Sequence, residues 1–419
     1  MTLDHGLCSY KAATANVGGL QARSKRLRPH PRRAQTMTDT YTLYGSYASY
    51  YTAKSRSHLR KKGIPFVERL PSENRFREHV RPTSGSHRIP QLLTPNGEVI
   101  QDSIAMLDHL EARFPELPAI PATPKQRIFV HLMELLGSEG LVGLAWRHRW
   151  LFEENLGFVK ADFGRSFRPQ GSDEELQKYG SLIADRMMSY GLPPTSEAIR
   201  AELDEQYLAV LKLLEAHCRH YPYLLGGHPS AADYAIMGAM HAHLGRDPAG
   251  LAFMQQHAPR VFRWVEHMLT PDVQSPEFHD SPVAYPAEDD IPETALAFIR
   301  HLLSEYSEPF VLSSLAFQQA MAIENPVAGH VLDAQTDQPK LRPTVVSFNG
   351  STHEHRADAH AVWIAQRSQR YFHSLDSATQ EQVIDTLASD NARALLTVPT
   401  KWVSERRDNR LTVGERLQR

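Results

Sequence analysis

The residues best suited to chemistry lie in one short stretch, where a predicted hairpin leads into a helix. The runs Ile89–Leu93 and Glu98–Ile100 flank an Asn-Gly turn, a strong hairpin signal. Pro90 must lie at a sheet edge or in a special bend, so the backbone before it can pair with an extended ligand. Asp102 and Ser103 open a helix, and a helix N-terminus binds carboxylates. The stretch predicts a thioredoxin-like site for a peptide-like thiol.

This stretch resembles the second half of the glutathione-binding domain of soluble glutathione transferases. In that family Val or Ile before a cis proline binds the cysteinyl backbone of glutathione, and an acidic residue followed by Ser binds its γ-glutamyl end. The matching residues are Ile89-Pro90 and Asp102-Ser103, and Asp102–Leu110 is similar to the family's ES-A-I-x-x-Y-L helix. The resemblance implies glutathione as co-substrate. Without it, the same residues serve only as turn and cap.

The family's chemical residue follows the first strand and aligns with Ser49. Here Ser49-Tyr50-Tyr51 stands where the family often has Ser-Pro-Phe or Cys-Pro-Phe, so the proline is missing. A free thiol has a pKa of roughly 8.5, and only its thiolate is a good nucleophile. A hydroxyl at the positive end of a helix would stabilise that thiolate. Tyr47, Tyr50 and Tyr51 are alternative donors. The loop holds no cysteine, which disfavours disulfide exchange.

Regular elements on either side must position these residues. We expect, in order, strand Tyr41–Ser46, helix Lys54–Lys62, strand Phe66–Leu70, helix Ser72–Val80, loop Arg81–Ser86, the hairpin and the helix from Asp102. This is the thioredoxin-like order βαβαββα, which agrees with the resemblance.

A second, all-helical domain is predicted after a proline-containing linker near Ala119. Apolar residues recur at helical spacing in Lys125–Phe152, Asp173–Tyr190, Ser196–His220, Ser230–Leu244 and Ala258–Leu269. Ser230 and Asp233 form a capping box, and the phrase around them resembles a folding motif of the glutathione transferase C-terminal domain. We interpret it as structural.

In that family the electrophile binds between the two domains, against the long helix after the linker. Trp146, Arg149 and Trp150 are the candidates there, because aromatic and basic side chains suit an aromatic or anionic substrate. Alternatively, two tryptophans four residues apart form a core-facing pair.

The remaining third of the chain extends beyond the common two-domain pattern. A proline-rich segment, 271–292, is followed by predicted helices Glu293–Ile323, Asp358–Leu375 and Ser377–Leu387, and by a strand Leu341–Asn349 that pairs with residues near Thr352. This extension is too apolar to be a tail. It carries no motif that implies chemistry.

Composition limits the partners. The net charge is −2 with 22% charged residues, which gives no reason to expect nucleic acid or an acidic membrane surface. No window approaches the apolar length of a spanning helix. Two cysteines allow no disulfide framework and favour a reducing compartment, hence the cytoplasm. The histidine clusters lack zinc-site spacing, so we expect no metal.

The first 36 residues are basic, with Asp4 as their one acid. They resemble a mitochondrial transit peptide, or they precede a natural start at Met37, which we favour. Either way we expect a disordered leader.

The sequence therefore predicts an α+β multidomain protein: leader 1–37, thioredoxin-like domain 38–118, all-helical domain 119–270 and mostly helical extension 271–419. The resemblance implies a glutathione transferase that activates the glutathione thiolate for attack on a small electrophile, with a homodimer left open. A non-catalytic binding or regulatory member of the family is the main alternative. A glutathione-dependent isomerase similar to the zeta class is a third.

Overall fold

The expected strand and helix order of the thioredoxin-like part is confirmed. The computed structural model describes residues 39–188, 197–332, 343–348, 351–356 and 358–417. The basic leader and Met37 lie outside the described residues. Four strands and two helices come first: β1 (Tyr41–Tyr44), α1 (Tyr50–Lys61), β2 (Phe66–Arg69), β3 (Gln91–Leu93), β4 (Val99–Gln101) and α3 (Ser103–Arg113).

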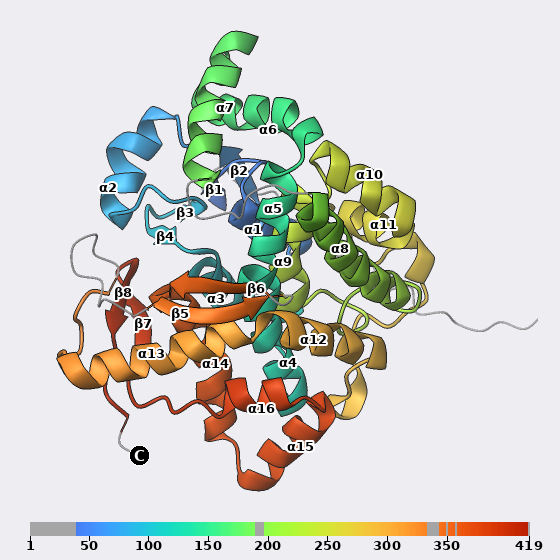
Figure 1. Ribbon diagram of the computed structural model, residues 1–419, viewed down its shortest axis with the longest axis vertical. Helices are drawn as coiled ribbons and strands as arrows, with labels where there is room; N and C mark the ends of the chain where they lie inside the picture. Colours follow the sequence, from blue (N-terminus) through green and yellow to red (C-terminus); the bar gives the residue numbers. More distant parts are fainter. Residues whose placement is uncertain (1–38, 189–196, 333–342, 349–350, 357, 418–419) are drawn as a thin grey trace, which may run out of the picture. The chain divides into compact units, whose positions relative to one another are not determined.

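The four strands form one mixed sheet in the order β2-β1-β3-β4 (Figure 1). Strand β1 runs parallel to β2 and antiparallel to β3, and β3 is antiparallel to β4. Leu43, Leu92 and Ile100 are buried with apolar residues of α1 and α3, such as Leu59 and Leu110. Burial of apolar faces against these helices holds the sheet edge in place.

Two local predictions were wrong. Helix α1 begins at Tyr50, not Lys54, because Ser49 caps it by accepting a hydrogen bond from the Thr52 amide. The segment Arg81–Ser86, expected to be a loop, begins with helix α2 (Arg81–Ser84), which continues the π-helical segment η2 (Phe76–Val80). Pro82 in the first turn is compatible with a helix start.

The expected all-helical part follows the linker. Its elements are α4 (Pro124–Leu135), η3 (Leu136–Gly140), α5 (Leu141–Trp150), α6 (Glu153–Phe167), α7 (Asp173–Met188), α8 (Glu197–Cys218), α9 (Ala231–Met237), η4 (Gly238–His243), α10 (Pro248–His257) and α11 (Pro259–Met268). Helices α6 and α10 were not predicted from periodicity. Asp233 accepts hydrogen bonds from the Ser230 and Leu224 amides, so the expected capping residue holds the start of α9.

The stretch Pro124–Trp150, formed by α4, η3 and α5, is 27 residues long and apolar enough to cross a membrane by length and composition. The expectation that no segment approaches such a length was therefore wrong. Of its apolar window, 78% is buried inside the protein. A helix that is apolar all round and packed on all sides is typical of a core.

The extension is built from helices and two hairpins. Two 3-10 turns, η5 (Pro276–Phe278) and η6 (Ala287–Asp289), interrupt the proline-rich segment. Then come α12 (Glu293–Tyr306), α13 (Glu308–Glu324), β5 (Pro343–Phe348), β6 (Ser351–Arg356), α14 (Ala359–Ser374), α15 (Ser377–Leu387), α16 (Asp390–Leu396), β7 (Ser404–Arg407) and β8 (Arg410–Val413). The predicted pairing near Thr352 is confirmed, because β5 pairs with β6 and Ser347 lies opposite Thr352.

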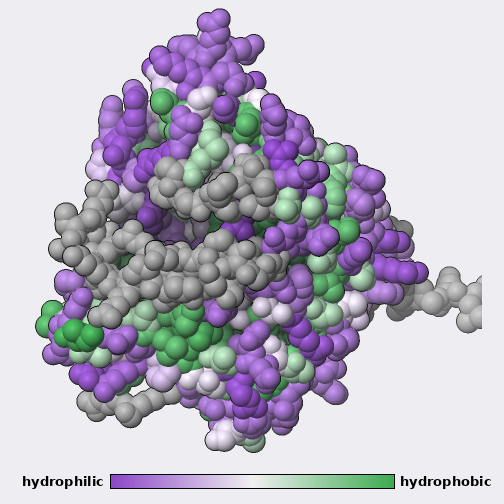
Figure 2. All heavy atoms as spheres, viewed as in Figure 1, coloured by the Kyte–Doolittle hydropathy of each residue, from purple (hydrophilic) through white to green (hydrophobic). Residues whose placement is uncertain are grey.

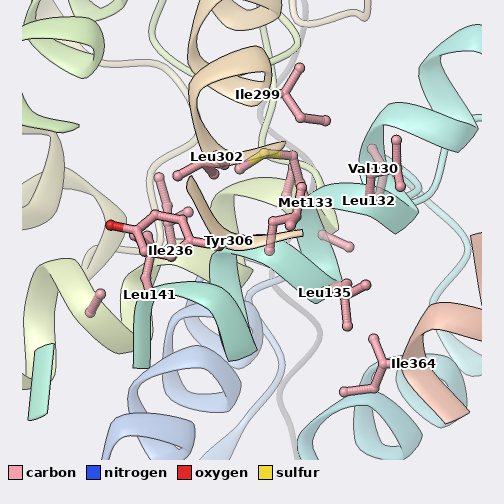
Figure 3. Close-up of a cluster of buried hydrophobic side chains, with 14 of the residues drawn as sticks. Val130, Leu132, Met133, Leu135, Leu141, Ile236, Ile299, Leu302, Tyr306 and Ile364 are labelled. Atoms are coloured by element: carbon pink, nitrogen blue, oxygen red, sulfur yellow. The ribbon is translucent and has the colours of Figure 1, made fainter. Parts of the chain in front are cut away.

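The extension shares its core with the rest of residues 39–419, which form one compact unit. Ile299, Leu302 and Tyr306 of α12 meet Met133 and Leu141 of the α4–α5 stretch (Figure 3). Helix α14 packs on α4 from another side, with Ile364 buried. These contacts explain the apolar composition that the sequence showed for the extension.

Candidate functional site

Three loops meet at one edge of the four-stranded sheet. Tyr44, at the end of β1, pairs with Gln91, the first residue of β3, and Gln91 pairs with Gln101, the last residue of β4. The register therefore brings together the loop that leads to Ser49, the segment that ends at Pro90, and the start of α3. The structure joins the three parts of the predicted site by backbone geometry alone.

The Ile89-Pro90 peptide bond is cis, as the resemblance implied. The side-chain amide of Gln91 holds the preceding loop by donating to the backbone oxygens of Ser86 and Arg88, each at 2.8 Å. Among the described residues, no partner takes up the backbone N–H or C=O of Ile89. That unused edge is available to an extended ligand.

Ser49 lies half-buried at the N-terminus of α1, where the positive end of the helix dipole favours an anion. Two of the competing hydroxyls point into the protein instead. Tyr50 donates to the backbone oxygen of Gly137 at 3.0 Å, and Tyr51 donates to Glu139 at 2.9 Å. Burial raises the pKa of both phenols well above its usual value.

Tyr47 is the accessible alternative, with 46% of the residue exposed. The guanidinium of Arg56 lies 4.1 Å from the centre of its ring, and Arg60 donates to its hydroxyl at 3.3 Å. Ser49 and Tyr47 therefore remain as candidate donors to a ligand, whereas the hydroxyls of Tyr50 and Tyr51 donate to partners inside the protein.

Asp102 lies at the N-terminus of α3 with both carboxylate oxygens in use. Its Oδ1 accepts from the Ile104 amide at 2.8 Å, and its Oδ2 lies 2.7 Å from Nε2 of His360. Its φ of 89° lies in the left-handed region. The described residues offer the Ser103 hydroxyl no hydrogen-bond partner, so it remains for a ligand.

His360 is the functional residue that sequence reasoning missed. It belongs to the first turn of α14 in the extension, 258 positions after Asp102. No spacing or motif links two residues so far apart. The one relevant signal in the sequence was the apolar composition of the extension, which indicated that it folds against the rest of the protein.

The pKa values of the pair move in opposite directions. Burial alone would lower the pKa of His360, but the Asp102 carboxylate, with Glu139 and Asp358, raises it to about 9. Burial opposes ionisation of Asp102, yet His360, Arg406 and the Ile104 amide hold its pKa well below its usual range. Near neutral pH the pair is therefore ionic.

A second ion pair fastens the extension one to two turns further along α3. Arg367 of α14 binds Asp108 of α3 through two nitrogens, at 2.7 and 2.9 Å. Its Nε also lies 3.4 Å from Glu134, whose carboxylate is on buried α4. One arginine thus ties together the thioredoxin-like part, the helical part and the extension.

Contacts within the protein account for the three predicted substrate residues. Arg149 is 1% exposed and donates to Asp247, to the backbone oxygen of Ala48 at 2.6 Å, and to that of Ala242. Trp150 is buried against Phe163, and Trp146 packs on the same cluster. These contacts match the core-facing alternative for the tryptophans. Arg149 instead links the loop before Ser49 to the helical part of the protein.

No metal centre is formed by the part of the chain that the structure describes: no group of three or more His, Cys, Asp or Glu side chains there is arranged to hold an ion.

Comparisons with known proteins follow the same division of the chain. Residues 43–118 match the family model "Glutathione S-transferase, N-terminal domain", and residues 197–267 match "Glutathione S-transferase, C-terminal domain". A probable maleylacetoacetate isomerase of Caenorhabditis elegans is 24% identical over 155 residues, which are 36% of this chain and 69% of that protein.

Solved glutathione S-transferase structures match this chain over most of their own length. A glutathione S-transferase from Rhodospirillum rubrum F11 is 17% identical, with a TM-score of 0.37, and the match covers 61% of this chain and 97% of that one. One from Methylobacterium radiotolerans, in complex with glutathione sulfonate, is 20% identical, with a TM-score of 0.33 and coverages of 60% and 100%.

Proposed function

Since the chain belongs to the glutathione S-transferase family, we propose that it binds glutathione at the sheet edge and acts on a small electrophile through the glutathione thiolate. The observation that carries the proposal is the register of β1, β3 and β4, which brings the Ser49 loop, the cis Ile89-Pro90 bond and the start of α3 to one edge.

The cysteinyl and γ-glutamyl parts of glutathione each have a partner at this edge. The cysteinyl backbone pairs with the unused N–H and C=O of Ile89. The γ-glutamyl carboxylate lies at the N-terminus of α3 and accepts from the Ser103 hydroxyl. The γ-glutamyl ammonium shares the Asp102 carboxylate with His360.

The chemical step needs little from the protein. The glutathione thiol loses its proton to water, and the Ser49 hydroxyl donates a hydrogen bond to the thiolate that remains. The thiolate then forms a carbon–sulfur bond with the electrophile, either by addition or with departure of a leaving group. A lower thiol pKa raises the thiolate fraction at neutral pH.

Calorimetry with glutathione tests the binding site. Asp102→Asn keeps an acceptor for the helix cap but removes the charge that faces the ammonium. A charge-assisted contact contributes about 1.5–3 kcal/mol, so the dissociation constant should rise roughly 10- to 150-fold. Ser103→Ala should weaken binding less, by about 1 kcal/mol.

Ser172→Ala is the matched control, because Ser172 also stands at a helix start but caps α7 at the surface. It should leave affinity unchanged. Unaltered affinity in both Asp102→Asn and Ser103→Ala would remove the basis for this site.

A glutathione-dependent isomerase is the second candidate, favoured by the similarity to the probable maleylacetoacetate isomerase. The same thiolate would add to a carbon–carbon double bond, allow rotation and leave again, so glutathione would not be consumed. Isomerisation of maleylacetoacetate that requires catalytic glutathione would select this reaction over transfer.

A different observation favours a non-catalytic member of the family: the Asp102 carboxylate already forms an ion pair with His360. Glutathione binding without a depressed thiol pKa, and without turnover in an electrophile panel, would select this reading.

A further inference from the structure

A cavity of about 470 Å³ lies between α4 and α14, beside α3. Its volume is in the range of small-molecule sites. None of the residues assigned above to glutathione lines it. It exists only because the extension packs on the helical part, so it is a feature separate from the sheet edge.

One face of α14 forms one wall. Four side chains on one side of this helix line the cavity: Trp363, Arg367, Arg370 and Tyr371. They share that side because residues three and four positions apart are neighbours on a helix surface. The opposite wall is α4, where Arg127 and His131 are one turn apart.

The charge in the cavity is unbalanced. Its lining includes three arginines and a single carboxylate, Asp108, which Arg367 already binds through two nitrogens. Neither Arg127 nor Arg370 makes an ion pair with any described residue. Burial lowers the pKa of His131, so that side chain is neutral near pH 7. Within the part of the chain that the structure describes, two guanidinium charges therefore have no counterion.

Arg127 is held at the cavity by its surroundings. Its Nε is buried and has no hydrogen-bond acceptor within the described residues. Its guanidinium lies 4.8 Å from the centre of the Tyr371 ring, which fixes it at the cavity wall.

Apolar surface completes the cavity. Trp363 and Tyr371 present aromatic rings from α14, and Ile120 adds an aliphatic side chain from the linker. We propose that this cavity binds a small aromatic anion, with its carboxylate or phosphate on Arg127 and Arg370 and its ring against Trp363 and Tyr371.

Titration of the full chain with phenyl phosphate and with benzoate, by calorimetry and tryptophan fluorescence, tests the proposal. Phenyl phosphate should bind at least tenfold more tightly than inorganic phosphate, and the uncharged benzyl alcohol should not bind. The ratio of phenyl phosphate to benzoate affinity distinguishes a phosphate site from a carboxylate site. Arg127→Gln and Arg370→Gln should each weaken binding at least tenfold.

Arg393→Gln is the matched control, because it removes the same charge from exposed α16, away from the cavity. It should leave binding unchanged. Arg370 is exposed, so Arg370→Gln remains informative even if Arg127→Gln does not fold. Equal binding by wild type and Arg370→Gln would overturn the proposal, as would equal losses in Arg393→Gln. Exclusion of phenyl phosphate by saturating glutathione would also overturn it, since it would assign the anion to the sheet edge.

Discussion

At the scale of single residues, Ser49 has two tasks that must be separated. Its oxygen accepts from the Thr52 amide at 3.3 Å and so caps α1, while its O–H is available to a thiolate. Loss of a serine cap costs about 1 kcal/mol of stability in either case. A drop in activity alone would therefore not show which task was lost.

Replacing Ser49 by Ala should raise the thiol pKa of bound glutathione. Each unit corresponds to about 1.4 kcal/mol of lost thiolate stabilisation, and we expect a rise of about one unit. The measurement is the thiolate absorbance of bound glutathione titrated against pH. Glutathione affinity should change little, because the proposed site assigns the rest of the molecule to Ile89, Asp102 and Ser103.

Ser389→Ala is a matched control for this experiment. Ser389 caps α16 and accepts from the Ala392 amide at the same distance, 3.3 Å. It should cost similar stability without moving the titration. Tyr47→Phe belongs in the same series: a shift in that variant, with Ser49→Ala overlaying wild type, would transfer the role to Tyr47.

Short-range signals predicted the local geometry at two parts of the candidate site. The cis Ile89-Pro90 bond and the start of a helix at Asp102-Ser103 could be inferred within a few positions, because turn and cap chemistry is short-ranged. The roles of these residues and of Ser49 in binding stay predictions. The partners that came from far away were not predictable. His360 is 258 positions from Asp102, and Asp247 is 98 positions from Arg149. Only packing brings such pairs together.

At the scale of elements, α6 and α7 cross at an unusually close approach. A Cβ added at Gly164 of α6 would overlap the backbone oxygen of Leu176, and one at Gly180 of α7 would overlap that of Lys160. The outer side of α7 is covered by hydrophilic residues, as the upper part of Figure 2 shows. These glycines, rather than large apolar side chains, allow the two helices to pack.

Gly164→Ala should therefore destabilise the α6–α7 pair by about 1–3 kcal/mol, since backbone atoms must move apart. Gly157 lies on the same helix with nothing near its added Cβ, and Gly157→Ala should stabilise the helix by about 0.5–1 kcal/mol. Amide hydrogen exchange of the two helices measures both effects. Equal protection in the two variants would contradict a close crossing.

Elements with local signals were predicted, and those without were missed. Helices α14 and α15 followed apolar periodicity closely, whereas the single helix expected over Glu293–Ile323 is divided at Ser307 into α12 and α13. The hairpin of β7 and β8 was missed, although Asp408 and Asn409 supply its two turn residues at positive φ. Strand β7, with the residues SERR, has no apolar residue, and β8, with the residues RLTV, is only four residues long, so the hydrophobic signal of a hairpin was weak.

At the scale of the whole molecule, ion pairs add to the apolar core contacts that attach the extension, so part of this attachment depends on pH. His360 gains its proton affinity from Asp102, with Glu139 and Asp358 adding to it and Arg406 nearby. A histidine whose pKa is raised on folding contributes fully below its unfolded pKa of about 6.5 and loses that contribution as pH rises through about 9.

His360→Gln should therefore lower the unfolding free energy most below about pH 6.5, by a few kcal/mol at most, and the difference from wild type should shrink toward pH 9. Lys61 gives an opposite trend above pH 7, because burial lowers its pKa to about 7. Only the difference between variant and wild type is therefore read, from denaturant unfolding at each pH.

His279→Gln is the control, since His279 is 72% exposed and its neighbour Asp280 is 92% exposed. Its curve should run parallel to that of wild type. A constant difference between His360→Gln and wild type from pH 6 to 9 would contradict an ionic role for His360.

Strand β4 lies at one edge of the sheet, and a side chain from the extension forms hydrogen bonds with its free backbone groups. Asn409 accepts from the Gln101 amide at 2.7 Å and donates to the Val99 oxygen at 2.9 Å, so its amide takes the place of a neighbouring strand. Asn409 follows Val99 by 310 positions. At ribosomal rates of roughly 5–20 residues per second, about 15 to 60 s pass between the synthesis of β4 and the synthesis of Asn409. During synthesis this sheet is thus open to pairing with other nascent chains, and chaperones have a defined strand to shield.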